Sequence, residues 1–259
     1  MRKIKKKTVT LMICGHGSRH KDTSTEFQNF IKKIKKRFPK NPLSYGFLEI
    51  SSPNVKLELT KLIRAKTSRI LTVPVMLFAA GHIKKDIPDL IKASLSSNSL
   101  TKIKISREIG LDQKLIKAAK QKIEETQQTS SQSISKKETL LMMVGRGTSM
   151  EKVNKKIEKI SRSLRNQIKF LDNDTSFMGI TGPRFENSLI ISARRKFKRI
   201  IIFPYFLFTG VLLDRIHSVT NKISKKFPET EFLISPCFKD HPLVIDAFAD
   251  RITKGLKGF

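Results

Sequence analysis

Three side chains in the first half of the chain, His16, Glu49 and His82, are of the types that bind a divalent transition metal. Two neutral imidazoles and one carboxylate suit cobalt, iron, nickel or zinc, and a set of three ligands leaves coordination positions open. Glycines flank the first histidine and directly precede the second, so a bulky ligand could come close to the backbone. We therefore predict that these three residues form the catalytic and metal-binding set.

An internal repeat supports this choice. At a constant offset of 130 positions (His16 to Arg146), matching residues recur along the two halves, which indicates a duplicated unit. The matches are Gly15-His16-Gly17-Ser18 with Gly145-Arg146-Gly147-Thr148, Pro53 with Pro183, Arg69 with Arg199, Pro74 with Pro204, and Phe78 with Phe208. The second copy has Arg146, Gly179 and Leu212 where the first has its two histidines and its glutamate. The chemistry is therefore predicted in the first copy.

Each half alternates short apolar runs with amphipathic segments, a pattern typical of βαβ units and a parallel sheet. The expected strands are residues 9–14, 43–50, 70–78 and 103–105, then 140–144, part of 168–180, 200–208 and 232–234. Apolar stripes at helical spacing lie between them, the clearest being Phe27, Phe30, Ile31, Ile34 and Phe38. The predicted fold class is α/β, with two doubly wound parallel sheets flanked by helices.

The length of 259 residues suits two domains of roughly 125 residues, each large enough for its own core. Residues 126–137 are polar and lack periodicity, as expected of a linker. The predicted organisation is a catalytic domain over 1–125, this linker, and a degenerate copy over 138–259.

The strand assignment brings the three candidate ligands together. His16 follows the first expected strand, Glu49 lies at the end of the second, and His82 follows the third. The carboxyl ends of parallel strands gather at one edge of a sheet, and ligands bind in the crevice outside that edge. The three residues are therefore expected together at this edge of the sheet.

The formal net charge of +30 has two interpretations. It could attract a polyanion such as nucleic acid, an anionic membrane or a polycarboxylate substrate. The lysines are spread over many expected helix faces, which favours a compositional bias. A nucleic-acid-binding module would need interleaved aromatic residues, but the chain has no Trp and two Tyr, so no nucleic-acid partner is expected.

The remaining composition points to a cytoplasmic protein. Only Cys14 and Cys237 are present, so no disulfide framework is expected and a reducing compartment fits best. Neither cysteine has a CxxC partner, which argues against a thiolate metal site. No apolar run approaches the ~20 residues needed to span a bilayer, so no membrane partner is expected.

Arg146 replaces the first histidine in the second copy and would convert a metal ligand into a permanent anion clamp. One hypothesis is that it binds a carboxylate of the substrate. The alternative is a salt bridge that holds its own loop.

With these residues identified, the chain resembles the class II sirohydrochlorin chelatases of the CbiX and SirB type over nearly its full length. The first half carries the motifs Gly15-His16-Gly17-Ser18-Arg19, Val73-Pro74 and Leu77-Phe78-Ala79-Ala80-Gly81-His82-Ile83. The second half carries Val144-Gly145-Arg146-Gly147 and Pro204-Tyr205-Phe206-Leu207-Phe208-Thr209-Gly210. The segment around His82 is the specific one.

The resemblance implies two tandem chelatase-like domains that face each other across a cleft. It implies insertion of cobalt, for cobalamin synthesis, or of iron, for sirohaem synthesis, into the octacarboxylate sirohydrochlorin, with the metal as a substrate and no permanently bound cofactor. His16 and His82 match the residues expected to be catalytic, and Glu49 matches less securely. Ser18, Arg19, Gly81, Lys84 and Arg146 are the expected substrate-binding residues. The duplication removes the usual need for a dimer, so a monomer is expected.

A metal-dependent hydrolase is the alternative, because the same three residues could activate a water molecule. It would act on an ester or phosphate without any tetrapyrrole.

Overall fold

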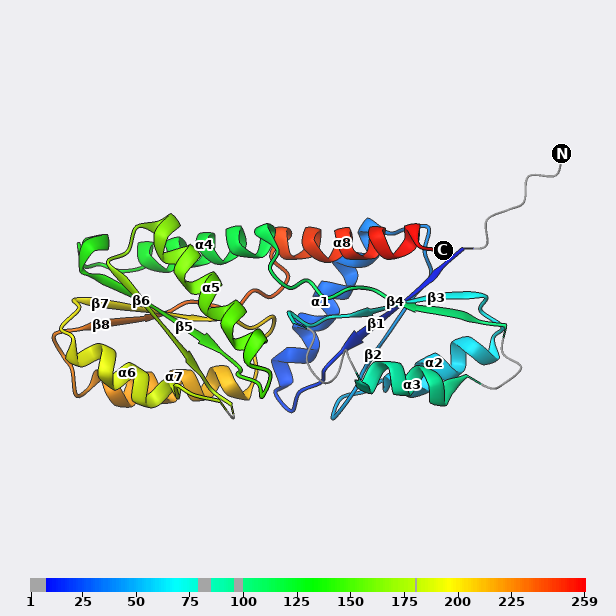
Figure 1. The fold of residues 1–259 in the computed structure, drawn as a ribbon, viewed down its shortest axis with the longest axis horizontal. Coiled ribbons are helices and arrows are strands. Elements are labelled where there is room, and N and C mark those ends of the chain that lie inside the picture. Colours follow the sequence, from blue (N-terminus) through cyan, green and yellow to red (C-terminus); the bar gives the residue numbers. More distant parts are fainter. Residues whose placement is uncertain (1–7, 79–84, 96–99, 180) are drawn as a thin grey trace. The chain divides into compact units, whose positions relative to one another are not determined.

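The computed structural model describes residues 8–78, 85–95, 100–179 and 181–259. The sequence predictions for Gly81, His82 and Lys84 therefore lie outside the described residues. The described chain contains two four-stranded parallel sheets with strand orders β2-β1-β3-β4 and β6-β5-β7-β8 (Figure 1). The equivalent orders confirm the duplication.

The elements follow one another in the same way in both halves. The first half contains β1 (Thr10–Gly15), α1 (Lys21–Arg37), β2 (Leu43–Phe47), α2 (Val55–Arg64), β3 (Arg69–Pro74), α3 (Ile87–Ser94), β4 (Lys102–Ile105) and α4 (Gln113–Gln128). The second contains β5 (Thr139–Gly145), α5 (Glu151–Ile168), β6 (Asp172–Phe177), α6 (Phe185–Arg194), β7 (Arg199–Pro204), α7 (Val211–Ser224), β8 (Glu231–Ile234) and α8 (Pro242–Lys257). None of the helices in the described ranges combines the length and the apolar character needed to cross a membrane.

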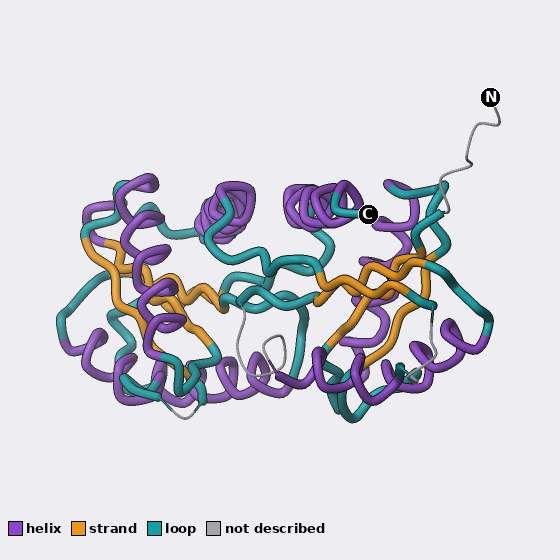
Figure 2. Tube along the Cα trace, turned by 45° about the vertical axis from the view of Figure 1, so that its right-hand side comes forward, coloured by secondary structure: helices purple, strands orange, loops and turns teal. Residues whose placement is uncertain are grey.

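Helices cover both faces of the first sheet, because alternate strand residues point to opposite sides (Figure 2). Met12 and Cys14 of β1 pack with Val55 and Leu59 of α2 and with Ile87 of α3. On the other face, the rings of Phe30 in α1 and Phe248 in α8 meet edge to face with centroids 4.9 Å apart. This arrangement confirms the doubly wound α/β fold expected from the sequence.

The second sheet is built in the same way. Leu140, Met142 and Val144 of β5 pack with buried residues of α6 and α7. Helices α4 and α5 contact each other, and α4 also contacts β7 and β8. The apolar stripes therefore have the role that their helical spacing predicted.

The chain forms two compact units whose boundaries differ from those expected. One unit is Met1–Gly110 with Ile245–Phe259, and the other is Leu111–Val244. Helix α4, expected in the first domain, belongs to the second unit, where the Lys122 carbonyl accepts a 3.3 Å hydrogen bond from the Ser235 hydroxyl. Most of α8, expected in the second domain, belongs to the first. The two halves have thus exchanged their last helices.

Contacts made by α8 show why it belongs to the first unit. Phe248 packs on α1, and the Arg251 guanidinium donates hydrogen bonds of 3.0 and 2.9 Å to the carbonyl oxygens of Glu108 and Ile109. A Cβ on Gly255 would lie 2.7 Å from the side chain of Leu71, so the helix backbone lies close against β3.

Candidate active site

The candidate site lies where the strands of the first sheet reach their carboxyl ends. β1, β2 and β3 run parallel and end at Gly15, Phe47 and Pro74. The expected strands over 43–50 and 70–78 extended further than this. Their last residues form the loops after the strands, and in a parallel sheet such loops form the ligand-binding edge.

Backbone hydrogen bonds join the loops that carry His16 and Glu49. The amide of Leu48 donates to the carbonyl oxygen of Gly15, and the amide of Glu49 donates to that of His16, both at 3.0 Å. His16 is partly exposed although its Nδ1 atom is buried, and Glu49 is exposed. The structure thus brings two of the three predicted metal ligands to adjacent backbone positions.

Hydrogen bonds between two serines form a second connection between the same two loops. The Ser51 hydroxyl accepts a hydrogen bond from the Ser18 amide at 3.0 Å and donates one to the Ser18 carbonyl oxygen at 3.1 Å. The hydroxyl of Ser18, a predicted substrate-binding residue, accepts a 3.0 Å hydrogen bond from the amide of His20. Arg19, another predicted substrate-binding residue, is exposed beside it.

Gly17 permits this close approach. Its φ is +99°, and a Cβ at this position would lie 1.8 Å from the carbonyl oxygen of Glu49. No side chain fits there, so the close approach of the loop that carries Glu49 requires a glycine at position 17.

The loops of the second copy have the same design but different side chains. The amides of Met178 and Gly179 donate to the carbonyl oxygens of Gly145 and Arg146 at 3.0 and 2.6 Å. A Cβ on Gly179 would lie 2.4 Å from the Arg146 carbonyl oxygen, so a residue other than glycine is excluded where the first copy has its glutamate. The Arg146 side chain is exposed.

The second copy also stabilises its loop differently. The Asn154 side chain accepts from the Thr148 amide at 3.1 Å and donates to the Thr148 carbonyl oxygen at 2.7 Å. Neither Ser51 nor Asn154 was predicted from the sequence to contribute to the site. The only signal for Ser51 was a hydroxyl side chain in each copy, because Thr181 aligns with it.

The predicted set of three metal ligands is only partly described, because His82 lies outside the described residues. Among the residues that are described, no group of three or more His, Cys, Asp or Glu side chains is placed to hold a metal ion. Cys14 adds no ligand: it is fully buried, and burial raises the pKa of its thiol, so the thiol stays protonated. The metal set therefore remains a prediction.

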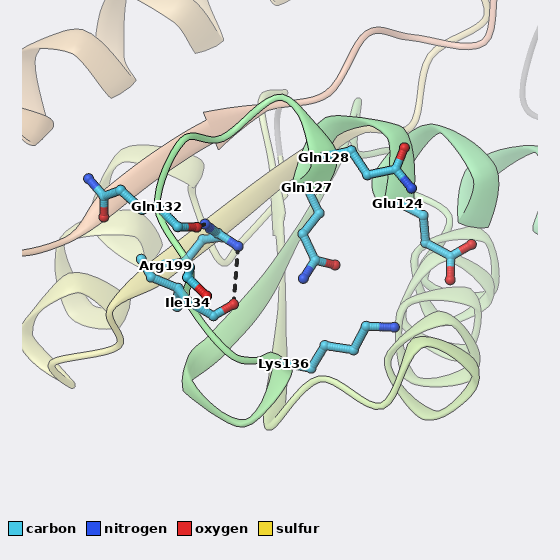
Figure 3. Close-up of a pocket in the computed structure, with 8 residues that line it drawn as sticks. Glu124, Gln127, Gln128, Gln132, Ile134, Lys136 and Arg199 are labelled. Atoms are coloured by element: carbon cyan, nitrogen blue, oxygen red, sulfur yellow. Dashed lines mark hydrogen bonds between the residues drawn. The ribbon is translucent and has the colours of Figure 1, made fainter.

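A polar cavity of about 520 Å³ lies elsewhere, beside the residues that connect the two repeats. It is lined by Glu124, Gln127, Gln128, Gln132, Ser133, Ile134, Lys136 and Arg199 (Figure 3). Arg199 begins β7, so the cavity lies at the amino end of this strand, at the opposite edge from Arg146. The cavity is thus separate from the loop that carries Arg146.

The guanidinium of Arg199 is bound by protein atoms. It is 1% exposed, pairs with Glu231, and donates from Nη2 to the Ser130 hydroxyl and the Gln132 carbonyl oxygen at 2.9 Å each. A weaker 3.4 Å bond reaches the Ile134 carbonyl oxygen and is drawn in Figure 3. Arg199 therefore holds the connecting segment in place.

The equivalent sheets and equivalent loops define a duplicated α/β protein with its candidate chemistry at strand carboxyl ends. The chain belongs to the CbiX family, because the model of that family matches residues 10–126 and again residues 140–255.

Two curated relatives cover most of the chain. It is 28% identical over 250 residues to a sirohydrochlorin cobaltochelatase of Priestia megaterium, covering 96% of this chain and 80% of that protein. It is 27% identical over 215 residues to a sirohydrochlorin ferrochelatase of the same organism, covering 83% and 78%. The solved structure of SirB from Bacillus subtilis with Fe3+ has the same fold, with a TM-score of 0.81, 24% identity, and coverage of 96% of this chain and 95% of that one.

Proposed function

We propose that this protein is a metal chelatase that inserts cobalt or iron into sirohydrochlorin. The observation that carries the proposal is the backbone hydrogen bond from Glu49 to His16, which brings the two residues together at the sheet edge of the first copy. The curated relatives of the chain are named for this reaction. The first copy is the catalytic one, and the second, with Arg146 and Gly179 at these positions, is degenerate.

In this reaction two pyrrole N–H protons leave the macrocycle as the divalent metal binds its nitrogens. His16 and His82 hold the incoming metal, with Glu49 as the third ligand. Imidazoles in model peptides titrate near pH ~6.5, so each of the two histidines could accept one of the two departing protons once its nitrogen has released the metal to the macrocycle. The metal and the macrocycle are both substrates.

Cationic side chains near the strand ends suit a substrate that carries eight carboxylates. Arg146 is exposed, and among the described residues it takes part in no ion pair, which favours carboxylate binding over a salt bridge that holds its loop. Arg19 and Lys84 would bind further carboxylates, and Ser18 and Gly81 complete the proposed contacts. The net charge of +30 raises the local concentration of such an anion.

The related proteins favour a chelatase over the hydrolase alternative, because those compared above are named as sirohydrochlorin chelatases. Their names divide between cobalt and iron, so the proposal includes both metals. We further propose that the protein is a monomer in the cytoplasm, without a nucleic-acid or membrane partner; light scattering of the purified protein tests the oligomeric state.

Anaerobic insertion of cobalt(II) and iron(II) into sirohydrochlorin, followed by absorbance, tests the proposal. The native chain should exceed the spontaneous rate, and His16→Ala and His82→Ala should each lose about 100-fold or more in kcat. His217→Ala, which removes an exposed histidine on α7, is the matched control and should keep the native rate. A native rate equal to the spontaneous rate with both metals would overturn the chelatase assignment. An ester or phosphate substrate turned over without tetrapyrrole would then favour the hydrolase.

A further inference from the structure

Ile50 has an unusual backbone conformation for its residue type. Its φ is +65°, and the Ser51 amide donates a 2.6 Å hydrogen bond to the carbonyl oxygen of Glu49. A bond over this span with a positive φ at the central residue is the rare, strained form of the γ-turn. A β-branched residue is an outlier in that region of backbone space, because its Cβ substituents crowd the main chain.

The exposure of Ile50 means that packing does not offset its unfavourable backbone conformation. Its side chain is 63% exposed, so it gains little from packing within its own unit. The other described non-glycine residues with positive φ are Lys66, Lys169, Lys196 and Lys239. Unbranched, hydrated lysines suit such positions at helix ends and turns better than isoleucine does. An apolar, β-branched residue at Ile50 therefore needs a reason outside local folding.

The position of Ile50 suggests that reason. It directly follows Glu49, whose amide is bonded to the His16 carbonyl oxygen, and it precedes Ser51, whose hydroxyl is bonded to Ser18. Both neighbours of the strained residue are thus anchored to the loop that carries the candidate catalytic histidine. Strain held by its surroundings in this way is found at ligand-binding sites, where it orders a side chain before the ligand arrives.

The second copy indicates that the isoleucine at this position has no part in metal binding. At the equivalent position it retains an isoleucine, Ile180, although the preceding glutamate has become Gly179. The isoleucine is therefore present whether or not the preceding residue can bind a metal. Its aliphatic side chain can make only apolar contacts.

We propose that Ile50 is a substrate-contact residue that packs against the apolar face of the tetrapyrrole ring. The inference rests on the proposed function, because it deepens the description of that same site. The ring of sirohydrochlorin is conjugated and apolar on its faces, with carboxylates at its rim. Cationic residues therefore suit the rim, and an ordered aliphatic side chain suits the face.

A titration of the full-length protein with metal-free sirohydrochlorin, followed by fluorescence, tests this proposal. Ile50→Asn should raise the Kd about tenfold, the order expected for one buried aliphatic side chain. Its thermal midpoint should stay equal or rise, since asparagine tolerates a positive φ. Ile50→Gly should show the same combination of weaker binding and equal or higher stability. A purely structural residue would not weaken binding while stability rises.

Two variants serve as controls. Ile50→Leu keeps an aliphatic side chain and should bind within about twofold of the native chain. Ile191→Asn makes the same change at an equally exposed isoleucine near the end of α6, 61% exposed, and should leave the Kd unchanged. Native-like binding by Ile50→Asn and Ile50→Gly, while the native chain inserts metal, would overturn this inference alone. Failure of the native chain to insert metal would overturn the proposed function and this inference with it.

Discussion

The main-chain amide of Glu49 donates a 3.0 Å hydrogen bond to the main-chain carbonyl oxygen of His16. This bond positions the two residues through the backbone, so their side chains are not needed to hold the loops together. The second copy keeps the same bond between Gly179 and Arg146 after both side chains have changed. The bond between the two loops therefore does not depend on the side chains of the residues that it joins.

Glu49→Ala should affect metal insertion but not the stability of the fold. The side chain is exposed and the bond to His16 is made by the backbone, so the free energy of unfolding should change by less than about 0.5 kcal/mol. Metal insertion should fall about tenfold or more if the carboxylate is a ligand. Urea denaturation and the insertion assay measure the two effects. Native activity in this variant would remove Glu49 from the metal set and leave the histidines.

Ser51→Ala should weaken the connection between the loops that carry His16 and Glu49. It removes both hydrogen bonds to the Ser18 backbone and should cost about 1–2 kcal/mol of stability, with a lower kcat because the loop of His16 is less ordered. Ser52→Ala, at the exposed neighbour, is the control. Equal urea midpoints for the two variants would mean that the serine pair contributes nothing.

Gly17→Ala should have a larger effect, because the new methyl group would overlap the Glu49 carbonyl oxygen and the φ of +99° disfavours alanine. We expect a loss of about 3 kcal/mol or more and no measurable metal insertion. Gly182→Ala is the matched control, because its Cβ would meet no atom within 4 Å. A stable and active Gly17→Ala protein would contradict the packing of these loops.

Arg199→Met should release the segment that connects the repeats. The substitution leaves Glu231 unpaired and removes the bonds to Ser130 and Gln132, so a loss of about 3–5 kcal/mol is expected. Limited proteolysis should then cleave within residues 129–136, while Arg194→Met, at an exposed arginine of α6, should resist as the native chain does. Resistance of both variants would show that other contacts hold this segment.

Both cysteines should be unreactive in the native protein. Cys14 and Cys237 are fully buried, and burial raises the pKa of Cys14, so little thiolate forms at neutral pH. A chromogenic disulfide reagent should detect no thiol before denaturation and two after it. Ser52→Cys supplies an exposed thiol as a positive control. Rapid labelling of the native chain would mean that one of the two sites opens.

Local sequence patterns predicted most of the fold. The stripe of Phe27, Phe30, Ile31 and Ile34 is buried as its spacing indicated. Strand ends were less accurate, because the apolar runs continue past them. Ile50 extends the run of β2 in sequence, yet it lies in a turn and is exposed. Composition cannot distinguish an apolar residue in a strand from one held in a loop.

The candidate site was predictable as far as the carboxyl ends of parallel strands determine it. Placing His16 and Glu49 after parallel strands of one sheet was enough to expect them at the same edge. The exchange of α4 and α8 was not predictable, because an apolar stripe shows that a helix face is buried but not which sheet buries it. The bonds of Ser51 and Asn154 depend on loop geometry that no periodic pattern encodes.

The exchanged helices also determine the order in which the protein can be completed during synthesis. The first unit needs Phe248 and Arg251, which follow the whole of the second unit, Leu111–Val244, in the sequence. The unit that carries His16 and Glu49 can therefore be completed only after the second unit has been synthesised, although most of its residues are translated earlier. A chain that stops before α8 would leave Phe30 of α1 without the Phe248 ring that packs on it.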